Sequence, residues 1–525
     1  MSLGHAGLRV QAPGFSLVMD PWRSSEGAFL GAWHQLPDNG HLAPQTWTST
    51  DWVTVSHEHL DHMDGSVLSA LAPATRVVIP RYPSTVLKDR LTRMGVDRVV
   101  EVSAWERLAL DDGGSWLTVI PEKSPMCHDS AFLVVSGGHS ILHLNDARLT
   151  AAQGRQAVEQ AGGQLDLLAV QMAGASWHPL CYEYPEDVIL KISRDKRMAK
   201  FKSVARFVKA VGPRVVVPYA GPPCFLDPDL ARHNGALVEP GLFPDQEQAA
   251  RWLAQAVPQV TVRSLLPGDV LEVGSGAEPG LTTDPHWSGF SYGDLQPYLR
   301  DYARRRAPHV AAVRSRHPDP GPGLDALFAE HFARLGELNT WFLRRIDMVA
   351  RFHVAGQNGG TWDVHLGPDS VRVDLAGQAR EVHYGFRVEG RWLRPVLSGE
   401  LGWEDLLLSL RFSAYRHPDR YNDYLVGLLK HGNAPALEAV QRYEADRDIK
   451  ETVVVSEGDR AWEVNRYCPH AGEDLLDGAV VRDGILRCLG HNFLFELTDG
   501  TCLNATCDPL VVRPAHQAAA GSRQP

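Results

Sequence analysis

Four residues of types that commonly bind metals lie close together near the start of the chain, in the sequence Ser56-His-Glu-His-Leu-Asp-His62. They are His57, His59, Asp61 and His62, and they follow an apolar stretch at residues 52–56 that is typical of a buried strand. Imidazole and carboxylate groups crowded in this way would need partners if they were buried, and a metal ion supplies such partners. The pattern therefore predicts a metal site, with these four residues as ligands and catalytic groups, at the end of a strand.

Two later residues extend this set of candidate ligands. His128 comes just before an expected strand at residues 131–135, with Asp129 as the adjacent alternative, and Asp146 follows the next expected strand, at residues 140–144. Nitrogen and oxygen ligands of this kind suit zinc and iron alike, so the ligands alone do not fix the metal.

A second group of candidate ligands lies near the C-terminus, where Cys468-Pro-His470 and Cys488-Leu-Gly-His491 give the pattern C-x-H…C-x-x-H. A Rieske [2Fe–2S] centre needs two thiolates on one iron and two imidazoles on the other, which two such loops supply. A structural zinc site of the Cys2His2 type is the alternative, but its ligands usually come as C-x-x-C and H-x-x-x-H pairs. The spacing therefore favours an iron–sulfur cluster held by Cys468, His470, Cys488 and His491.

This iron–sulfur module bears on the identity of the N-terminal metal. A hydrolytic zinc site has no use for electrons, whereas iron that activates O2 needs them singly and in sequence. The presence of both sites in one chain therefore predicts oxidative chemistry at one or two non-haem irons.

The elements that must position these residues divide the chain of 525 residues into three parts. Strands are expected at residues 8–12, 15–19, 52–56, 131–135, 140–144, 167–170 and 215–218, and helices between them, notably at 195–211, indicate an α/β layered domain over residues 1–285. Residues 286–444 form a middle α+β segment, with strands near 361–373 and 382–388 and helices at 403–415 and 421–429. Residues 445–525, with short strands at 452–456, 479–488 and 492–497, predict a small all-β domain.

Composition and charge narrow the class of protein further. The net charge of −11 does not favour a nucleic-acid partner, and without a run of about 20 apolar residues we expect no membrane span. Seven cysteines are too few for a disulfide framework and the first residues do not resemble a signal peptide, so we expect a cytoplasmic protein. A homo-oligomer is compatible with the sequence.

The N-terminal part resembles the metallo-β-lactamase superfamily over residues 1–280, and residues 450–515 resemble Rieske ferredoxin and oxygenase modules. The first resemblance implies an αββα sandwich in which His57 and His59 bind one metal, Asp61 and His62 bind a second, and Asp146 bridges them, with His128 as a third ligand of the first metal. The superfamily's last ligand, a histidine after a late strand, is missing from Val217-Pro-Tyr-Ala-Gly221. His178 is a substitute, although a place in the substrate pocket suits it better.

Over residues 1–430 the chain is similar to the N-acetyl-sugar nucleotide hydroxylases. The similar segments, in order, are Met19–Trp22, Gly31–Trp33, Ser56–His62, Gly174–Ser176, the basic stretch Lys191–Lys209, Val217–Gly221 and Trp403–Leu406. This resemblance implies insertion of one oxygen atom from O2 into the N-acetyl group of a nucleotide-activated amino sugar, which gives N-glycolyl, with UDP-N-acetylmuramate as the first choice of substrate. It also implies electrons from NAD(P)H, delivered by a reductase, ferredoxin or cytochrome partner through the Rieske cluster.

The basic stretch offers residues for binding a nucleotide diphosphate. Lys196, Arg197 and Lys200 lie in a local excess of positive charge within an acidic chain, which suits phosphate. The alternative is an ordinary solvated helix face, which most charge runs are. With His178 and Tyr219, these three are the expected substrate-binding residues.

Three other functions stay open at this point. One keeps the chemistry but acts on a specialised metabolite, because a fold does not fix the substrate. Another is a zinc hydrolase with the Rieske module as a redox sensor. The third is a reductase of O2 or NO like the flavodiiron proteins, which usually carry glutamate where this chain has His59 and are paired with a flavodoxin module that this sequence lacks.

Overall fold

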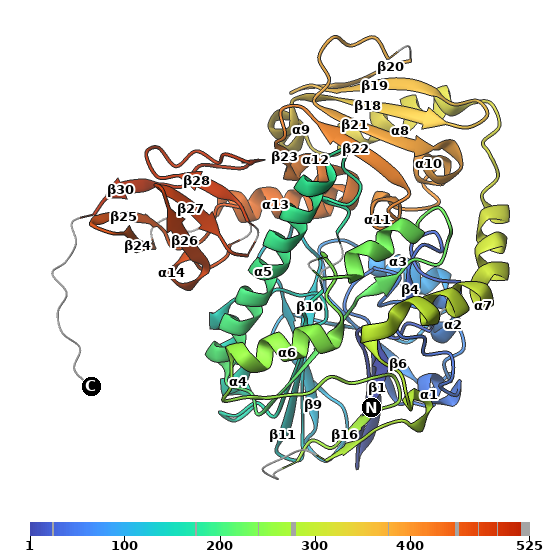
Figure 1. Ribbon diagram of the computed structural model, residues 1–525, viewed down its shortest axis with the longest axis vertical. Coiled ribbons are helices and arrows are strands. Elements are labelled where there is room, and N and C mark those ends of the chain that lie inside the picture. The colour runs from blue at the N-terminus through green and yellow to red at the C-terminus, as the bar shows by residue number, and fades with distance from the viewer. Residues whose placement is uncertain are drawn as a thin grey trace.

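The structure, a computed structural model, describes residues 1–23, 26–173, 176–239, 241–274, 280–375, 377–446, 451–470, 472–490 and 492–515. Figure 1 shows the N-terminal domain below, the sheet of the middle segment above it and the C-terminal module to one side. Within the described residues, no helix combines the length and the apolar character needed to cross a bilayer.

Two β-sheets form the centre of the N-terminal domain. The first has the order β1-β2-β3-β5-β6-β7, with bounds Ser2–Gly4, Gly7–Ala12, Phe15–Met19, Trp52–Thr54, Arg76–Pro80 and Val99–Val102. The second has the order β15-β13-β12-β11-β10-β9-β8, with bounds Thr261–Val262, Val215–Tyr219, Leu167–Gln171, His139–His143, Ser130–Ser136, Trp116–Pro121 and Arg107–Ala109. β12 and β13 are buried along their whole length and are rich in valine and leucine, as expected of parallel strands covered on both faces.

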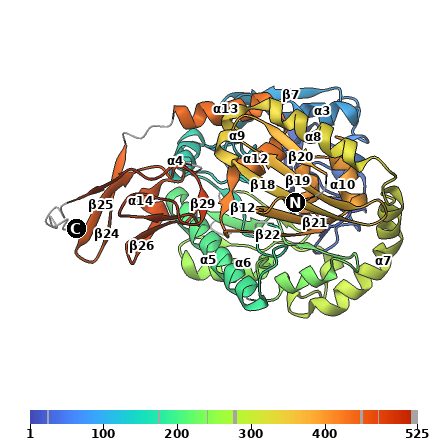
Figure 2. The ribbon, with the colours of Figure 1, turned by 90° about the horizontal axis from the view of Figure 1, so that it is seen from above.

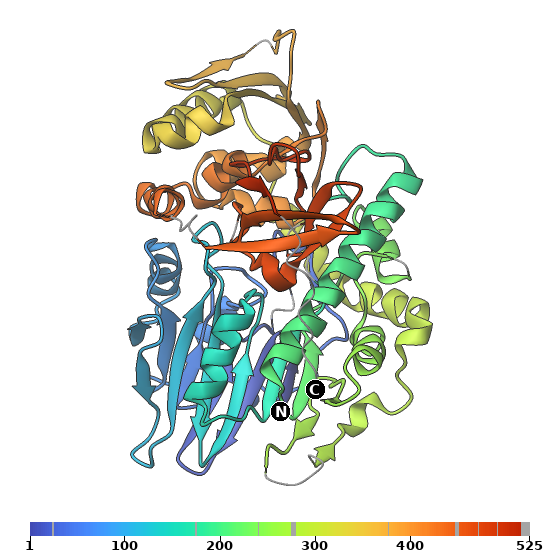
Figure 3. The same ribbon diagram turned by 90° about the vertical axis from the view of Figure 1, so that its left-hand side faces the viewer.

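Helices cover the outer face of each sheet. α1 (Gln45–Thr48), α2 (Gly65–Leu68) and α3 (Val86–Arg93) lie on the first sheet, and α4 (Ala151–Gln160), α5 (Glu186–Val211) and α6 (Gln246–Ala256) lie on the second. A further apolar layer, which includes Leu17, Phe132 and Val217, lies between the two sheets. Figure 3 shows the sheets side by side, with the long α5 along one outer face. These layers confirm the αββα sandwich that was predicted for this domain.

α5 is longer than the sequence suggested, because it begins at Glu186 rather than near residue 195. Pro185 precedes it, and two acidic residues stand in its first turn, where negative charge suits the helix dipole. Phe201 and Val208 pack in the apolar cluster between this helix and the second sheet. The helix ends at Gly212, whose φ of 60° lies in the left-handed region that glycine adopts easily.

The middle segment is built on a five-stranded sheet with the order β20-β19-β18-β21-β22. The bounds of these strands are Val371–Asp374, Gly360–Leu366, Met348–Ala355, Tyr384–Glu389 and Phe412–Arg416. α8 (Leu324–Leu338) and α10 (Gly390–Leu397) pack on this sheet. The other helices are α7 (Leu295–Arg316), α9 (Thr340–Ile346), α11 (Trp403–Leu408), α12 (Asp423–His431) and α13 (Ala434–Ala445).

The middle segment differs from its prediction in two places. Strand β18 was not predicted, and the prediction of one helix at residues 403–415 is wrong, because these residues form the short α11 followed by strand β22. Leu410 adopts a φ of 56°, which ends the helical path, and buried Arg411 pairs at 2.9 Å with buried Asp227 of the N-terminal domain. The apolar run at 406–412 is compatible with a helix and with a strand, so its pattern does not distinguish them. The tertiary contacts determine where the helix ends and the strand begins.

The C-terminal module is all-β, as predicted. β24 (Thr452–Glu457), β25 (Arg460–Asn465) and β30 (Val512–Pro514) form one sheet, and β26 (Ala479–Arg482), β27 (Ile485–Cys488) and β28 (Leu494–Glu496) form another. The turn Asp483-Gly484 has positive φ at both residues, as a tight hairpin requires. Figure 2 shows that the module projects from one side of the molecule, with β24 and β25 far from the body.

Short elements complete the chain. β4 (His34–Gln35) pairs with β14 (Pro223–Cys224), β16 (Val270–Leu271) with β17 (Leu281–Thr282), and β23 (Tyr421–Asn422) of the middle segment with β29 (Ala505–Thr506) of the C-terminal module. Three 3-10 turns, η1 (Ala231–Leu237), η2 (Pro285–Trp287) and η3 (Tyr292–Asp294), and the short α14 (Leu475–Gly478) are also present. The divisions at residues 285/286 and 444/445 stay predictions.

Candidate metal centres

The loop after β5 carries the H-x-H-x-D-H motif into the interior of the domain. His57, Asp61 and His62 are almost fully buried. His57, His59 and Asp146 each offer one ligand atom, and these three atoms lie within 4.8 Å of one another, with His57 Nε2 2.8 Å from His59 Nδ1. Three ligand atoms at this spacing have the size of a metal site. The structure thus brings together predicted ligands from two strand ends.

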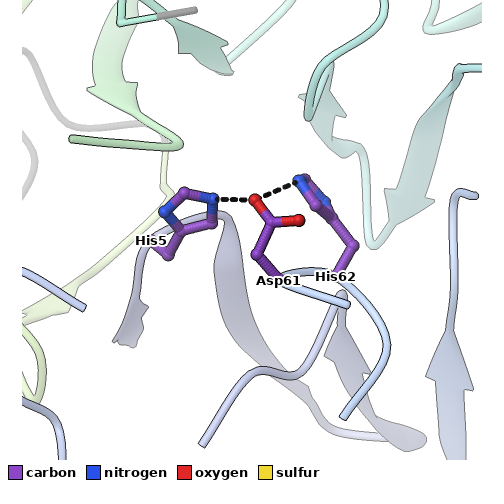
Figure 4. Close-up of side chains that lie close together, drawn as sticks. All are labelled: His5, Asp61 and His62. Atoms are coloured by element: carbon purple, nitrogen blue, oxygen red, sulfur yellow. Dashed lines mark hydrogen bonds and ion pairs between the residues drawn. The ribbon is translucent and has the colours of Figure 1, made fainter. Parts of the chain in front are cut away.

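A second group lies beside the first and contains one residue that the sequence analysis missed. His5, Asp61 and His62 each offer a ligand atom within 4.8 Å of one another (Figure 4). Asp61 Oδ2 is 2.8 Å from His5 Nε2 and 3.7 Å from His62 Nε2. Asp146 Oδ1 is 3.4 Å from the same nitrogen of His62, so Asp146 faces both groups, as a bridging carboxylate must.

His5 comes from the turn between β1 and β2, far from the motif in sequence. Its φ of 47° lies in the left-handed region, and its carbonyl oxygen accepts a hydrogen bond of 3.0 Å from the backbone N–H of Ala220. Ala220 lies in the loop after β13, which is where the late histidine of the superfamily pattern is missing. His5 thus occupies the neighbourhood of the missing ligand, although no spacing pattern marks it in the sequence.

Buried partners hold the histidines of the motif in fixed orientations. Asp20 Oδ2 lies 2.9 Å from His62 Nδ1 and accepts a hydrogen bond of 2.6 Å from Ser56 Oγ, which in turn lies 2.8 Å from His57 Nδ1. Both rings are therefore turned so that Nε2 faces into the site. Partners of this kind fix the ring of a ligating histidine and raise its basicity.

Several buried atoms of the site have no hydrogen-bond partner among the residues that the structure describes. They include Asp61 Oδ1, together with His62 Nε2 and Asp146 Oδ1, which lie 3.4 Å apart as an ion pair but make no hydrogen bond. A buried polar atom left in this state costs roughly 1–3 kcal/mol, and more for a charged group. A cation between the two groups would satisfy all three atoms at once. The residues present therefore fit a metal centre.

The charges around the site favour protonated His59 and His62 beside an ionised Asp146. Burial alone would lower the pKa of His59, but the neighbouring Glu404 outweighs it and raises the pKa to about 9. Burial likewise opposes ionisation of Asp146, yet His62 beside it holds the pKa of this carboxyl below its usual range. Because a ligating histidine must be neutral, metal binding here displaces protons.

The middle segment contributes to the site through α11. Glu404 Oε1 lies 3.0 Å from His59 Nε2 and 2.9 Å from Lys430 Nζ of α12. The next residue, Asp405, pairs with Arg90 at 2.9 Å, and Arg90 also donates to a backbone carbonyl of the motif. The motif loop is therefore held from two sides, by α3 and by a segment far away in sequence.

Glu404→Ala should weaken metal retention at the N-terminal site by about 10–100-fold, the usual effect of losing a group that orients a histidine ligand. Glu404→Gln keeps an oxygen that accepts from His59 Nε2 and should lose less. Metal content after dialysis against a series of chelators measures the effect, with the exposed Glu400→Ala as the control. Equal retention in Glu404→Ala and in the wild type would contradict this role.

His128 lies outside both groups. Its Nδ1 is 3.7 Å from Glu58 Oε1, and its ring tilts against that of His431 at 4.7 Å between centroids. The adjacent alternative, Asp129, is nearer to the first group, with Oδ1 3.9 Å from His57 Nε2. The third ligand of the first position stays a prediction, for which the geometry favours Asp129 over His128.

The two predicted substrate lysines lie on α5. Lys196 Nζ donates to Ser176 Oγ at 3.0 Å and to the carbonyl oxygen of His178 at 2.8 Å, while Lys200 Nζ donates to Gln171 Oε1 at 2.7 Å. Both lysines are half-buried, and Gln171 is the last residue of β12, so the amines face the carboxyl edge of the second sheet. The alternative of an open solvated face is therefore wrong for these two residues.

The other predicted substrate residues have different surroundings. Buried Arg197 donates to Glu239 at 2.6 Å. Buried Tyr219 accepts a hydrogen bond of 2.5 Å from the backbone N–H of Asn145, which supports the turn that carries Asp146. His178 makes edge-on ring contacts with two tyrosines of the loop that follows it. Their roles in substrate binding stay predictions.

Of the candidate cluster ligands that the structure describes, Cys468 and His470 lie in the loop that follows β25, and Cys488 is the last residue of β27. Cys468 and Cys488 are fully buried in the apolar core of the module. The two loops meet where the ring of His470 lies 4.1 Å from that of Phe493, between centroids. His491 lies outside the described residues, so the ligand set stays a prediction.

Comparison with known proteins gives two domain matches. Residues 1–220 match the β-lactamase superfamily domain, and residues 431–513 match the Rieske [2Fe-2S] domain. A protein of Mycobacterium tuberculosis that carries the name Rieske 2Fe-2S iron-sulfur protein is 29% identical over 524 residues, which cover 96% of this chain and 97% of the relative. A protein of the same name from Mycolicibacterium smegmatis is 28% identical over 522 residues, with the same coverage of 96% and 97%.

Two solved structures are also similar. CmlA, a diiron β-hydroxylase from Streptomyces venezuelae, shares 20% identity over 51% of this chain and 52% of that chain, with a TM-score of 0.35. An isothiocyanate hydrolase from Delia radicum gut bacteria shares 10% identity over 50% of this chain and 95% of that chain, with a TM-score of 0.34. The match to CmlA thus spans about half of that hydroxylase. With the two domain matches, the αββα sandwich and the all-β module, this chain joins a metallo-β-lactamase-type domain to a Rieske [2Fe–2S] domain.

Proposed function

We propose that this protein is an O2-dependent monooxygenase, in which non-haem iron at the N-terminal site receives electrons through the Rieske cluster. The supporting observation is a Rieske domain in the same chain as a buried histidine–carboxylate site whose unpartnered atoms, within the described part of the chain, fit a metal. Iron bound there supplies the O2 activation that hydrolytic zinc does not, and so accounts for the electron-transfer domain. The protein is then an oxidoreductase that takes electrons from a partner reductase.

The proposed ligands form two sets that share one carboxylate. His57, His59 and Asp146, together with Asp129 or His128, hold one iron, and Asp61, His62 and Asp146 hold a second where two bind. His5 Nε2 donates to Asp61 Oδ2, and the other oxygen of Asp61, which accepts no hydrogen bond from the described residues, would be available to a metal. The chain's own contribution is to fix these groups with buried partners and to keep bulk water from them.

We propose a nucleotide-activated amino sugar as the substrate, with UDP-N-acetylmuramate first. The positive charge of Arg148 acts on both Lys196 and Lys200, so three cations lie within electrostatic range of one another. Such a group suits a diphosphate, because charge-assisted contacts to phosphate contribute roughly 1.5–3 kcal/mol each when they are partly shielded. Lys200 also lies within electrostatic range of Asp146, so a diphosphate bound there brings the attached sugar close to the metal ligands.

The pKa values of the two lysines predict a pH dependence of substrate binding. Burial, reinforced by Arg148, lowers the pKa of Lys196 to about 7 and that of Lys200 to about 8. The charge that attracts phosphate is present below these pKa values and is lost as the pH rises through them. We expect kcat/KM for the nucleotide sugar, which reports on the free enzyme, to fall about tenfold or more between about pH 6.5 and pH 9.

Matched variants separate this effect from others. Lys196→Arg keeps its charge at every pH in this range and should flatten the profile. The double variant Lys196→Ala/Lys200→Ala should raise KM about tenfold or more near pH 6.5, with a smaller effect on kcat, and the difference should shrink at high salt. Lys191→Ala, at an exposed position of the same helix, is the control. An unchanged KM in the double variant, with a confirmed nucleotide-sugar substrate, would remove these lysines from the substrate site.

The reaction itself is tested by mass. Protein loaded with iron and the cluster is incubated with UDP-N-acetylmuramate, and separately with CMP-linked and other UDP-linked amino sugars, together with isotope-labelled O2 and an NAD(P)H-dependent reductase. We expect a product in which an N-glycolyl group with one labelled oxygen atom replaces the N-acetyl group. Hydrolysis of the substrate without any need for electrons would contradict the proposal.

A further inference from the structure

The cluster-binding loop of the Rieske domain rests on the middle segment of the same chain. His470 Nε2 lies 2.7 Å from Asp423 Oδ2, and the hydroxyl of Tyr421 donates to the other carboxylate oxygen of Asp423 at 3.1 Å. Asp423 is only 9% exposed and is the first residue of α12, which Asn422 caps by accepting a backbone hydrogen bond. The carboxylate is therefore fixed at both oxygens, and one of them holds a candidate cluster ligand.

The same loop also contacts the N-terminal domain. Lys123 Nζ lies 3.3 Å from the ring centroid of Tyr467, and Arg206 of α5 lies 3.6 Å from Glu473. Strand β29 of the module pairs with β23, which directly precedes α12. Figure 1 shows the module next to α13 and α5. These contacts hold the cluster loop against the N-terminal domain and the middle segment of the same chain.

α12 continues from this contact to the N-terminal metal site. Lys430, in its last turn, pairs with Glu404, which in turn contacts His59. The helical rise from Asp423 to Lys430 is about 10 Å, at roughly 1.5 Å per residue. One short helix therefore separates the contact with His470 from the contact with His59.

The middle of α12 touches the loop that carries Asp129. Met126 packs so closely on Gly427 that a Cβ atom added there would lie 2.7 Å from Met126 Sδ. His431 Nε2 lies 3.2 Å from the carbonyl oxygen of Met126, and the His431 ring lies 4.7 Å from that of His128. α12 thus contacts the cluster loop at one end and loops of the N-terminal metal site along the rest of its length.

We propose that Asp423 is a positioning residue that fixes the cluster loop on α12 through His470, so that the two metal sites of one chain work as a pair. This inference rests on the proposed function. In the step concerned, one electron leaves the reduced cluster, where ferrous iron becomes ferric, and is taken up at the N-terminal iron of the same chain. O2 is the final oxidant, and the reductase restores the cluster. The electron does not cross between subunits.

Mixed variants test whether the pair lies within one chain. Cys488→Ala removes a cluster ligand and Asp146→Asn removes an N-terminal ligand, and the two variants are co-expressed with different tags and purified through both. We expect oxygen insertion no higher than in either variant alone, because neither chain holds both sites. If no mixed complex forms, the working unit is a single chain, which supports the proposal. Activity well above the single variants would show transfer between chains and would overturn it.

The role of Asp423 is tested by the rate at which the reduced cluster is reoxidised. Chemically reduced protein with both metals is mixed with O2 and substrate, and the decay of the reduced-cluster EPR signal is followed in time. We expect Asp423→Ala to slow this decay by about ten- to hundredfold, since small misplacements of reacting groups have effects of that size. Asp423→Asn, which keeps an acceptor oxygen, should lie between Asp423→Ala and the wild type. Glu438→Ala, at an exposed position of α13, is the control.

A further comparison distinguishes failure of this inference from failure of the proposed function. Wild-type protein without N-terminal iron should reoxidise its cluster much more slowly than the loaded protein. If both reoxidise alike, the proposed function fails. If they differ but Asp423→Ala matches the wild type, only the role of Asp423 is overturned. If Asp423→Ala loses its cluster, Asp423→Asn is used in its place. A reduced-cluster decay in Asp423→Asn as fast as in the wild type, with an unchanged midpoint potential of the cluster, would show that Asp423 is not a positioning residue.

Discussion

Asp146→Asn is expected to leave the N-terminal site without iron and to stop oxygen insertion, while the EPR signal of the reduced Rieske cluster remains. Asp146 groups with His57 and His59 and lies 3.4 Å from His62 Nε2, so both metal positions lose a negative ligand at once. Asparagine keeps the shape of the side chain but not its charge. Loss of a mere partner of a metal ligand already costs about 10–100-fold, so we expect kcat to fall by at least about a hundredfold.

Iron content and EPR, measured on one preparation, separate the two metal sites. Asp112→Asn makes the same change at an exposed position of the same domain and should match the wild type in both measurements. His59→Ala should also lose iron and keep the Rieske spectrum. Full activity with unchanged iron in Asp146→Asn or in His59→Ala would mean that the N-terminal ligands are wrongly assigned.

Cys488→Ala is expected to abolish NAD(P)H-driven turnover without emptying the N-terminal site. Cys488 is the last residue of β27 and is fully buried, and a Rieske cluster cannot form with one of its two thiolates missing. The proposed iron ligands and the substrate lysines belong to another domain, so iron content and substrate binding should stay as in the wild type. Turnover stops because electrons from the reductase no longer reach the iron.

Cys502 provides the matched control for this variant. It is also buried in the C-terminal module, but it lies outside the C-x-H…C-x-x-H pattern. Cys502→Ala should therefore keep the cluster and its electron transfer. Turnover of Cys488→Ala at the wild-type rate, with the same reductase, would show that the module is not the electron donor and would favour a redox-sensing role.

Local sequence patterns were enough to predict a metal site in the N-terminal part of the chain and a Rieske module in the C-terminal part. The H-x-H-x-D-H run after an apolar stretch, and C-x-H…C-x-x-H between short strands, each concentrate ligands within a few residues. The structure places the residues it describes from these patterns on the loops after β5 and β25 and at the end of β27. Asp146 could be predicted because it follows the end of β11, at the edge where the strands of such a sandwich present their loops. The fold class followed from the same alternation of strands and helices.

The residues that the sequence did not reveal contact partners that are far away in the sequence. His5, Glu404 and Asp423 each have one decisive contact, with Asp61, His59 and His470 respectively. No period or spacing records a contact of this kind, because only the tertiary fold brings the partners together. The secondary structure of the middle segment could not be predicted fully for the same reason. Its apolar run at 406–412 becomes the end of α11 and the start of β22 only through contacts with the N-terminal domain.

The position of α12 between the two sites has a thermodynamic consequence. The helix contacts His470 at one end and Glu404 near the other, so both sites bear on one rigid element. Coupling free energies are reciprocal: if reduction of the cluster tightens substrate binding, bound substrate must raise the midpoint potential of the cluster by the same free energy. For a one-electron couple, each tenfold change in affinity corresponds to about 59 mV. If bound substrate raises the midpoint potential in this way, the protein accepts electrons most readily when its substrate is bound and reduces little O2 without it.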